Sequence, residues 1–404
     1  MKNNICVIGL GYIGLPTLLL LAKKNYNVTG YDINKKVISS IKQYKNFKTE
    51  RDISLLLKKI IVKKKINLTN KFPNKGNFDT YIICVPTPIH KINKKIKPDL
   101  KSLISVVKKL ANVLKNDDNV IIESTVPVGT TEKINTMFSK KKIDKLNINL
   151  AYCPERVLPG NIIHELIHNQ RIIGGINKQS TFAASNLYKS FVKGRILLTD
   201  SKTAEMIKLT ENSFRDVNIA FANEISLICK KNNINTDKVI KMANLHPRVS
   251  ILKPGIGVGG HCIPVDPWFL IQYDENNSKL LKAARNSNIK KTNFVVKDIK
   301  KTINAFVKEN KKKPIVSFFG LTYKKDTNDI RNSPCTYIID CLKELKNKYY
   351  IVDPYIYKYK NVFTVDSDKA FQKSDIIIIL NKHTPFEEFF SNISFKNKII
   401  LDYC

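Results

Sequence analysis

The segment PGIGVGGHCIPVDPW, from residue 254 to 268, holds the residues of this chain that are best suited to covalent chemistry. Cys262 follows a run of three glycines between 257 and 260, and Asp266 comes four residues later. A thiolate close to a lysine has a lowered pKa and becomes a competent nucleophile. Glycines remove side chains and permit unusual backbone angles, so they are expected to leave room for a ligand here. Taken alone, the segment leaves three roles open for Cys262: nucleophile, metal ligand or small residue in a tight turn.

A second group of polar side chains lies on a predicted helix. Lys208, Asn212 and Arg215 occur at i, i+4 and i+7, so they share one helix face and are suited to holding an oxyanion or a phosphorylated ligand. The motif PERVLPG places Glu155 just beyond a predicted strand, where it could act as a base or orient water. A solvated helix face and a salt-bridging glutamate are the alternatives that local sequence leaves open.

The N-terminus carries a phosphate-binding pattern. GLGYIG, residues 9–14, follows the apolar run ICVIG and precedes a helical pattern, which is the context expected for a dinucleotide-binding loop. Gly9 allows a tight turn, Gly11 a close approach of backbone to pyrophosphate, and Gly14 close packing of helix on strand. Asp32 closes the next strand and can bind both ribose hydroxyls, which favours NAD over NADP. The alternative is that the glycines serve only a turn.

Two further strand ends are predicted at the same edge of the sheet. VPTP and ESTVPVGT place Thr87 and Thr125 where open parallel sheets bind their ligands. Both threonines are therefore candidate cofactor contacts. Simple strand termination or helix capping is the alternative.

The spacing of apolar runs predicts an α/β fold. Strand-like runs alternate with helical patterns over the first 200 residues, which indicates a doubly wound parallel sheet buried on both faces. Residues 201–232 lack Gly and Pro and carry a helical apolar stripe, which predicts a rod of roughly 45 Å. Such a rod can bridge domains or pair with its copy in a dimer. Strand patterns from residue 314 onward predict a smaller Rossmann-like α/β domain. The expected domains are 1–198, 199–305 and 306–404.

Composition excludes several classes of protein. With 43% hydrophobic and 25% charged residues the chain is globular, and it contains no apolar run long enough for a membrane helix. The N-terminus leads directly into the glycine motif, so a cytoplasmic protein is expected. Neither the eight scattered cysteines nor His164 and His168 form a metal-binding pattern, so no metal is predicted. The net charge of +35 is spread evenly, which disfavours a nucleic-acid site.

The whole chain resembles the nucleotide-sugar 6-dehydrogenase family, which comprises UDP-glucose, UDP-N-acetylhexosamine and GDP-mannose dehydrogenases. Matching motifs occur in order: GLGYIG, VPTP, STVPVGT, PERVLPG, AEMIKLTENSFRDVNIAFANE, PGIGVGGHCIPVDPW and FGLTYKKDTNDIRNSP. The resemblance implies two successive NAD-dependent oxidations at C6 of the sugar, with the aldehyde retained on the enzyme. It also implies a homodimer formed through the central helix, with Arg248 reaching the partner's site.

Roles for single residues follow from the resemblance. Cys262 is implied as the nucleophile, Lys208 and Asn212 as oxyanion-stabilising groups, and Asp266 and Glu155 as groups that organise water and protons. The implied NAD contacts are Gly9, Gly11, Tyr12, Ile13, Gly14, Asp32, Thr87, Thr125 and Arg331. The implied substrate contacts are Arg156, Val157, Lys208, Asn212, Arg215, His246, Arg248, Gly259, Tyr323 and Lys324.

Two departures from the family pattern bear on the sugar. UDP-glucose dehydrogenases commonly have serine before the catalytic cysteine and lysine before the aspartate, whereas this chain has His261 and Val265. The resemblance therefore favours an N-acetylated hexosamine, and UDP-N-acetyl-D-mannosamine is the expected substrate. UDP-N-acetylglucosamine and UDP-glucose are the alternatives within the family. A dinucleotide-binding sensor without catalysis is the alternative from another class.

Overall fold

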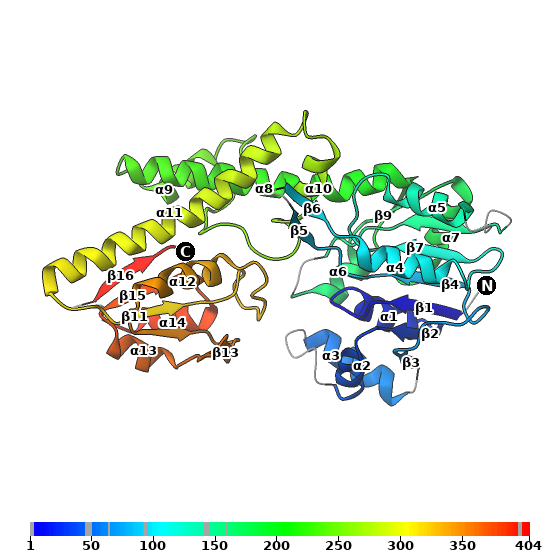
Figure 1. Cartoon of the computed structure of the whole chain (residues 1–404), viewed down its shortest axis with the longest axis horizontal. Coiled ribbons are helices and arrows are strands. Elements are labelled where there is room, and N and C mark those ends of the chain that lie inside the picture. Colours follow the sequence, from blue (N-terminus) through cyan, green and yellow to red (C-terminus); the bar gives the residue numbers. More distant parts are fainter. Residues whose placement is uncertain are drawn as a thin grey trace. The chain divides into compact units, whose positions relative to one another are not determined.

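Two units make up the chain in a computed structural model that describes residues 4–44, 51–63, 65–92, 95–140, 146–157, 160–394 and 398–404. The first unit takes in Met1–Glu211 and Trp268–Tyr273, and the second Asn212–Pro267 and Asp274–Cys404. The boundary passes through two helices, α8 (Ser201–Lys231) and α10 (Asp266–Tyr273). Each unit has its own sheet (Figure 1).

The sheet of the first unit has the strand order β10-β9-β8-β7-β4-β1-β2-β3. Its strands are β1 (Asn4–Ile8), β2 (Asn27–Tyr31), β3 (Ile66–Thr69), β4 (Thr80–Ile83), β7 (Asn119–Ile122), β8 (Asn149–Tyr152), β9 (Arg171–Gly175) and β10 (Ile196–Asp200). The order reverses at β1, whose neighbours are β2 and β4. Ligands of such sheets bind at the carboxyl ends of the strands beside this reversal. The predicted doubly wound fold is confirmed.

Alternate residues of the central strands belong to two separate hydrophobic cores, one on each face of the sheet. Ile5 and Val7 face one core, whereas Cys6 and Ile8 face the other, as the two-residue period of a strand requires. The first core packs against α1 (Gly14–Lys23), α2 (Lys35–Lys42), α3 (Arg51–Val62), α6 (Ile162–His168) and α7 (Lys178–Tyr188). The second packs against α4 (Lys101–Leu110) and α5 (Thr130–Lys140). Leu10 of the glycine loop and Leu15 at the start of α1 belong to the first core, which fixes the loop to that face of the sheet.

One feature of this sheet departs from the prediction of a parallel sheet. β9 pairs with β8 in the antiparallel sense, while β9 and β10 are parallel to each other. A strand buried on both faces has the same apolar pattern in either direction, so the sequence carries no signal of the reversal. A short antiparallel hairpin, β5 (Ile89–Ile92) with β6 (Lys95–Pro98), was also not anticipated.

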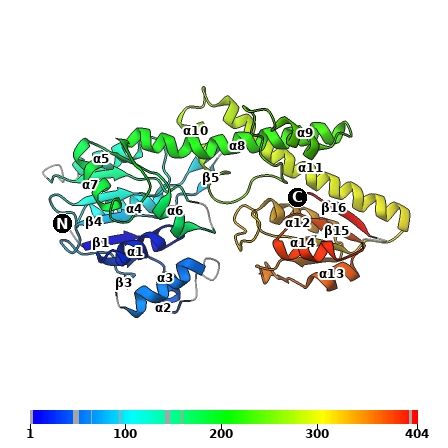
Figure 2. The same ribbon diagram turned by 180° about the vertical axis from the view of Figure 1, so that it is seen from behind.

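The second unit contains a smaller parallel sheet with the order β12-β11-β15-β16. Its strands are β11 (Val316–Phe319), β12 (Tyr349–Val352), β15 (Ile376–Ile379) and β16 (Ile399–Asp402). One face packs against α11 (Lys279–Asn310) and α12 (Pro334–Leu342). The other face packs against α13 (Ser367–Lys373) and α14 (Thr384–Ser391), as Figure 2 shows from behind. This sheet confirms the predicted C-terminal Rossmann-like α/β domain, and the strands β13 (Lys358–Tyr359) and β14 (Val362–Phe363) add a small hairpin.

The long helices match the expected rod. α8 spans 31 residues, and α11 spans 32 and is also visible as a long helix in Figure 1. Buried Asp216 of α8 pairs with Arg285 of α11 at 2.5 Å and accepts a hydrogen bond from Asn288 at 2.8 Å. α9 (Thr236–Ala243) follows α8 along the chain. In the described ranges no helix has the length and apolarity to cross a bilayer.

Candidate active site

The glycines of the N-terminal loop are required by close packing. A Cβ on Gly14 would lie 1.8 Å from the carbonyl oxygen of Gly9, and one on Gly9 would lie 2.7 Å from the carbonyl oxygen of Cys84. Gly9 also has a φ of +93°. A Cβ on Gly11, in contrast, would meet no atom within 4 Å. The loop therefore packs tightly on the sheet at its two ends and stays open at Gly11, where the backbone can approach a ligand.

The residues around this loop fit a dinucleotide. Ile13 occupies the N-cap position of α1, and its side chain cannot cap the helix, so the first N–H groups of α1 remain suited to phosphate. Tyr12 beside them is 36% exposed. Asp32 accepts hydrogen bonds from the backbone N–H groups of Leu10 at 3.0 Å and Asn34 at 2.8 Å, which hold its carboxylate at the end of β2. This is the donor and acceptor set that a pyrophosphate and an adjoining ribose require.

The loop that carries Thr87, after β4, contacts the loop that carries Thr125, after β7. The hydroxyl of Thr87 donates to the carbonyl oxygen of Thr125 at 2.6 Å. One residue earlier, Ser124 donates to the carbonyl oxygen of Val85 at 2.7 Å. The structure thus brings these two predicted cofactor residues together at the carboxyl ends of β4 and β7.

Lys208 and Glu155 also lie together in the first unit. The Lys208 side chain is only 7% exposed, and its Nζ donates to the carbonyl oxygen of Glu155 at 2.5 Å. The Glu155 carboxylate Oε2 lies 3.9 Å from the same ammonium, while its Oε1 accepts from the backbone N–H of Val157. A buried ammonium beside a fixed carboxylate can transfer a proton and stabilise an oxyanion.

Arg156, a predicted substrate contact, is held by a residue that sequence reasoning did not select. Its guanidinium binds Glu211 of α8 through two bonds, Nε to Oε2 at 3.0 Å and Nη2 to Oε1 at 2.5 Å. It also donates from Nη1 to the carbonyl oxygen of Gln170 at 3.1 Å. Residues 158 and 159 of the PERVLPG motif lie outside the described residues.

A buried ion pair lies beneath these loops. Glu123, at the end of β7, pairs with Arg171 of β9, and both side chains are almost fully buried. The Glu123 carboxylate accepts from the hydroxyl of Tyr188 at 2.6 Å and from the thiol of Cys84 at 3.2 Å. Arg171 donates to the sulfur of Cys153 at 3.1 Å. In the sequence, Glu123 stands two residues before the predicted cofactor residue Thr125, but that position does not indicate its distant partners.

Cys262 and Asp266 belong to one turn in the second unit. The carbonyl oxygen of Cys262 accepts from the backbone N–H groups of Val265 at 2.9 Å and Asp266 at 2.8 Å, and α10 begins at Asp266. The carboxylate of Asp266, which is 2% exposed, accepts from Nδ2 of Asn212 at 2.6 Å. Because Lys208 and Asn212 are one turn apart on α8, they share a helix face.

The glycines before Cys262 do not leave space for a ligand as expected. A Cβ on Gly257 would lie 2.1 Å from the hydroxyl oxygen of Thr292, and one on Gly259 would lie 2.4 Å from Cβ of Tyr323. A Cβ on Gly260 would lie 3.0 Å from the Tyr323 ring. The space beside these glycines is filled by Tyr323 and Thr292. The prediction that the glycines leave room for a ligand is therefore wrong. Packing does, however, place the predicted substrate residues Gly259 and Tyr323 in contact.

The other predicted residues lie on loops and exposed helix faces. Arg331 binds the carboxylate of Asp329 through Nε at 2.9 Å and Nη2 at 2.6 Å, and its carbonyl oxygen accepts from Gly260. His246 and Arg248 follow α9, where the Arg248 N–H donates to Nδ1 of His246 at 3.3 Å. Two further predicted substrate residues are exposed: Arg215 and Lys324.

A glycine loop and an acidic strand end on a doubly wound sheet define a dinucleotide-binding protein. Three family models match the chain in order. They are the NAD binding domain (residues 3–192), the central domain (202–290) and the UDP binding domain (317–404) of the UDP-glucose/GDP-mannose dehydrogenase family. The chain belongs to this family. The predicted family resemblance, class of enzyme and NAD cofactor are thus confirmed.

Similar proteins cover almost the full length. A Methanocaldococcus jannaschii protein named UDP-N-acetyl-D-mannosamine dehydrogenase is 44% identical over 99% of this chain and 92% of its own length. A Ralstonia solanacearum protein named NDP-N-acetyl-D-galactosaminuronic acid dehydrogenase is 38% identical over 99% of this chain and 95% of its own length. The solved structure of a UDP-D-ManNAc dehydrogenase from Pyrococcus horikoshii is 38% identical, with a TM-score of 0.89 over 99% of this chain and 95% of that one.

Proposed function

We propose that this protein oxidises the C6 alcohol of UDP-N-acetyl-D-mannosamine to the carboxylate of UDP-N-acetyl-D-mannosaminuronate, with two NAD per sugar. The observation that carries this proposal is the 44% identity, over 99% of the chain, to the M. jannaschii protein of that name. His261 and Val265, next to the cysteine turn, support an N-acetylated sugar over glucose. We also propose that the protein is cytoplasmic and that its product is used to make surface polysaccharide.

Cys262 makes the second oxidation possible in this proposal. The first oxidation converts the alcohol to an aldehyde, which has no further hydride to give until a nucleophile adds to it. The Cys262 thiolate adds to the aldehyde carbon and forms a thiohemiacetal, whose oxidation gives a thioester. Water then displaces the thiol and releases the acid. Bound NAD supplies the hydride acceptor for each oxidation. Overall, alcohol, two NAD⁺ and water give carboxylate, two NADH and three protons.

The remaining catalytic residues act on protons and developing charge. We assign Lys208 to the oxyanion that forms when the thiolate adds, with Asn212 as a second donor. Glu155, beside Lys208 Nζ, accepts a proton from the attacking water or orients it. Asp266 holds the amide of Asn212 in place through their 2.6 Å hydrogen bond.

Ligand binding is divided among several segments in this proposal. NAD is held by the loop from Gly9 to Gly14, by Asp32, and by Thr87 and Thr125, with Arg331 as a further contact. A carboxylate at Asp32 repels a 2′-phosphate, which supports NAD over NADP. The nucleotide sugar is assigned to Arg156, Val157, Arg215, His246, Arg248, Gly259, Tyr323 and Lys324. We further propose a functional division into residues 1–198 for NAD, 199–305 for catalysis and dimerisation, and 306–404 for UDP.

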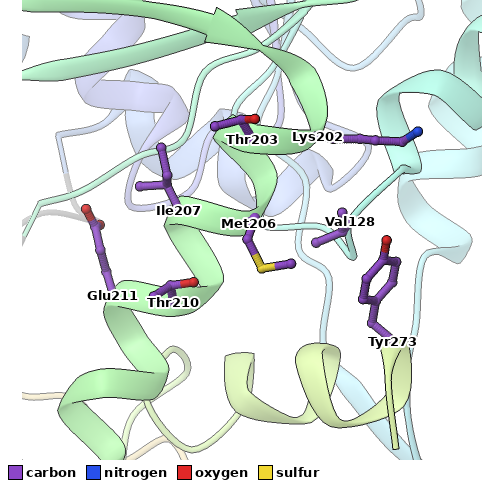
Figure 3. A pocket seen from close by; sticks show the side chains of 8 residues that line it. All are labelled: Val128, Lys202, Thr203, Met206, Ile207, Thr210, Glu211 and Tyr273. Atoms are coloured by element: carbon purple, nitrogen blue, oxygen red, sulfur yellow. The ribbon is translucent and has the colours of Figure 1, made fainter. Parts of the chain in front are cut away.

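A homodimer through α8 is part of the proposal. Met206, Phe214, Phe221 and Ile228 lie on the helix face opposite Lys208 and are 36%, 68%, 51% and 52% exposed. A hollow of about 430 Å³ adjoins Met206 on this face, and Val128 and Tyr273 line it with Met206 (Figure 3). Phe214, Phe221 and Ile228 recur every seven residues, and an apolar repeat of that length on an exposed helix is the pattern by which two copies of a helix pair. We call these four side chains the α8 stripe.

A stoichiometry assay tests the proposal. NADH formed per sugar is measured with UDP-N-acetyl-D-mannosamine, UDP-N-acetylglucosamine, UDP-N-acetylgalactosamine and UDP-glucose. We expect two NADH and the highest kcat/KM with the mannosamine. One NADH would indicate a simple alcohol dehydrogenase, and none with any sugar would indicate a dinucleotide-binding sensor. A clear preference for another sugar would reassign the substrate within the family.

A further inference from the structure

Glu205 of α8 is a fully buried carboxylate to which the proposed chemistry gives no role. It is 0% exposed. Its Oε2 accepts from the backbone N–H of Gly129 at 2.5 Å, and its Oε1 accepts from the backbone N–H and the hydroxyl of Thr131 at 2.8 and 2.6 Å. These donors belong to the end of the loop after β7 and to the first turn of α5. Glu205 thus fastens that loop to α8.

The loop held by Glu205 carries Thr125, one of the two adjoining cofactor threonines. Its first half is tied to the neighbouring loop through the Ser124 and Thr87 hydrogen bonds. Gly129 at its other end has a φ of +84°, a left-handed backbone conformation that the hydrogen bond to Glu205 holds. Both ends of the loop are therefore fixed, and Glu205 fixes the end that faces α8.

The same helix carries Lys208 one turn further on. Lys208 Nζ is engaged with the carbonyl oxygen of Glu155, and Glu211, a further turn along, pairs with Arg156. Residues 205, 208 and 211 are three apart, so they lie within one arc of α8. The helix is consequently tied at successive turns to the cofactor loop and to the loop that carries Glu155.

Burial of the Glu205 carboxylate has an unfavourable free energy of desolvation. Removal from water raises the pKa of Glu205, and its partners are neutral N–H and O–H donors. A buried charge without a cation contributes little to stability compared with an apolar contact of the same size. A carboxylate can, however, accept all three hydrogen bonds in one geometry, which defines the position of the loop.

We propose that Glu205 is a positioning residue. It fixes the position of the Thr125 loop relative to Lys208, so that the bound cofactor and the Lys208 ammonium are correctly placed with respect to each other. This inference rests on the proposed dehydrogenase function. It assigns Glu205 no contact with substrate or cofactor.

Glu205→Gln tests the inference, because glutamine keeps the size of the side chain but cannot accept all three hydrogen bonds. We expect the Kd for NADH, measured by fluorescence titration, and the KM for NAD to rise about tenfold. We expect kcat to fall by a similar factor and the KM for the sugar to stay within about twofold. A purely structural role would lower the amount of active enzyme and leave both KM values unchanged.

The matched control is Glu132→Gln. Glu132 is on α5 and pairs with Lys202 of α8 at 2.8 Å, but both side chains are about half exposed. The Glu132–Lys202 pair joins the same two helices at the surface. The kinetic constants of Glu132→Gln should therefore match those of the wild type. Thr131→Val is the second variant, because it removes only the hydroxyl bond. It should change the KM for NAD in the same direction by a smaller factor, and it stands in if Glu205→Gln does not fold.

Folded variants with a wild-type Kd for NADH and wild-type KM for NAD would overturn the inference. The NADH titration does not involve a sugar, so the two proposals fail separately. If the wild type oxidised no nucleotide sugar but Glu205→Gln still weakened NADH binding, the proposed function would fail and the role of Glu205 in the cofactor loop would stand.

Discussion

Two cysteines of the first unit, Cys84 and Cys153, are kept as thiols by their surroundings. Burial raises the pKa of Cys84 well above its ordinary value, and the neighbouring Glu123 carboxylate adds to that rise. Burial likewise raises the pKa of Cys153. Both groups therefore stay as thiols and are poor nucleophiles at neutral pH. Cys262, which like Cys84 is partly buried, begins the turn that leads to Asp266.

Cys262→Ser separates the two oxidations. Serine can occupy the turn, but its hydroxyl is a much weaker nucleophile than a thiolate, so we expect acid production to fall by about 10³-fold or more. Sugar and NADH binding should be unchanged. Product analysis by mass spectrometry, with Cys84→Ser as the matched control, checks this outcome. Full acid production by Cys262→Ser would contradict the covalent mechanism.

Different faces of α8 have different roles. One face carries Lys208 and Asn212 beside the anchoring residues Glu205 and Glu211, and the opposite face carries the α8 stripe. In the second unit a third side of the helix packs on α11 through buried Asp216 and Arg285. The apolar pattern of residues 201–232 predicted the helix. What each face of the helix contacts depends on residues that are distant in sequence.

Lys291 of α11 makes this packing sensitive to pH. Its Nζ donates to Ser226 of α8 at 2.5 Å, and burial lowers its pKa to about 8. The unfolded chain binds this proton up to about pH 10.5, so the penalty on the folded state is complete below pH 8. Wild-type stability should therefore rise as the pH increases from about 8 to 10.5.

Lys291→Met removes that penalty. We expect the free energy of unfolding at pH 7 to increase by about 1–2 kcal/mol, after allowance for partial exposure of the ammonium. The gain should shrink as the pH approaches 10. Urea unfolding at several pH values provides the measurement, and Lys290→Met, at an exposed neighbouring position, is the control. A gain that is constant with pH would argue against titration of Lys291.

At the scale of the whole molecule, the α8 stripe predicts the assembly state. Phe221→Lys should convert a dimer to a monomer, because the symmetry of a dimer introduces each substitution twice and each buried phenylalanine contributes about 1.5–3 kcal/mol. Sedimentation velocity over a concentration series measures the change. Tyr357→Lys, at a position that is 77% exposed in the second unit, is the matched control. A Phe221→Lys protein that sediments like the wild type would exclude this helix as the interface.

Much of the candidate site could be predicted because its residues are local in sequence. The GLGYIG loop, Asp32 and the i, i+4 pair of Lys208 and Asn212 depend on turns, strand ends and helix period, which neighbouring residues determine. The Glu123–Arg171 pair and Glu205 could not be predicted in this way. Their partners lie 48 and 74 to 76 residues away, and a charged residue near a strand or on a helix is ordinarily at the surface.

The sequence by itself determined the α/β class, the strands of both sheets that alternate with helices, and the family motifs, because these follow from hydrophobic period and from turns within a few residues. The direction of β9, the partners of Arg156 and the packing of the glycines before Cys262 were decided only by tertiary structure. Each depends on which distant side chain fills the adjoining space. Gly259 illustrates the difference, because its sequence suggested room for a ligand and its place in the fold is filled by Tyr323.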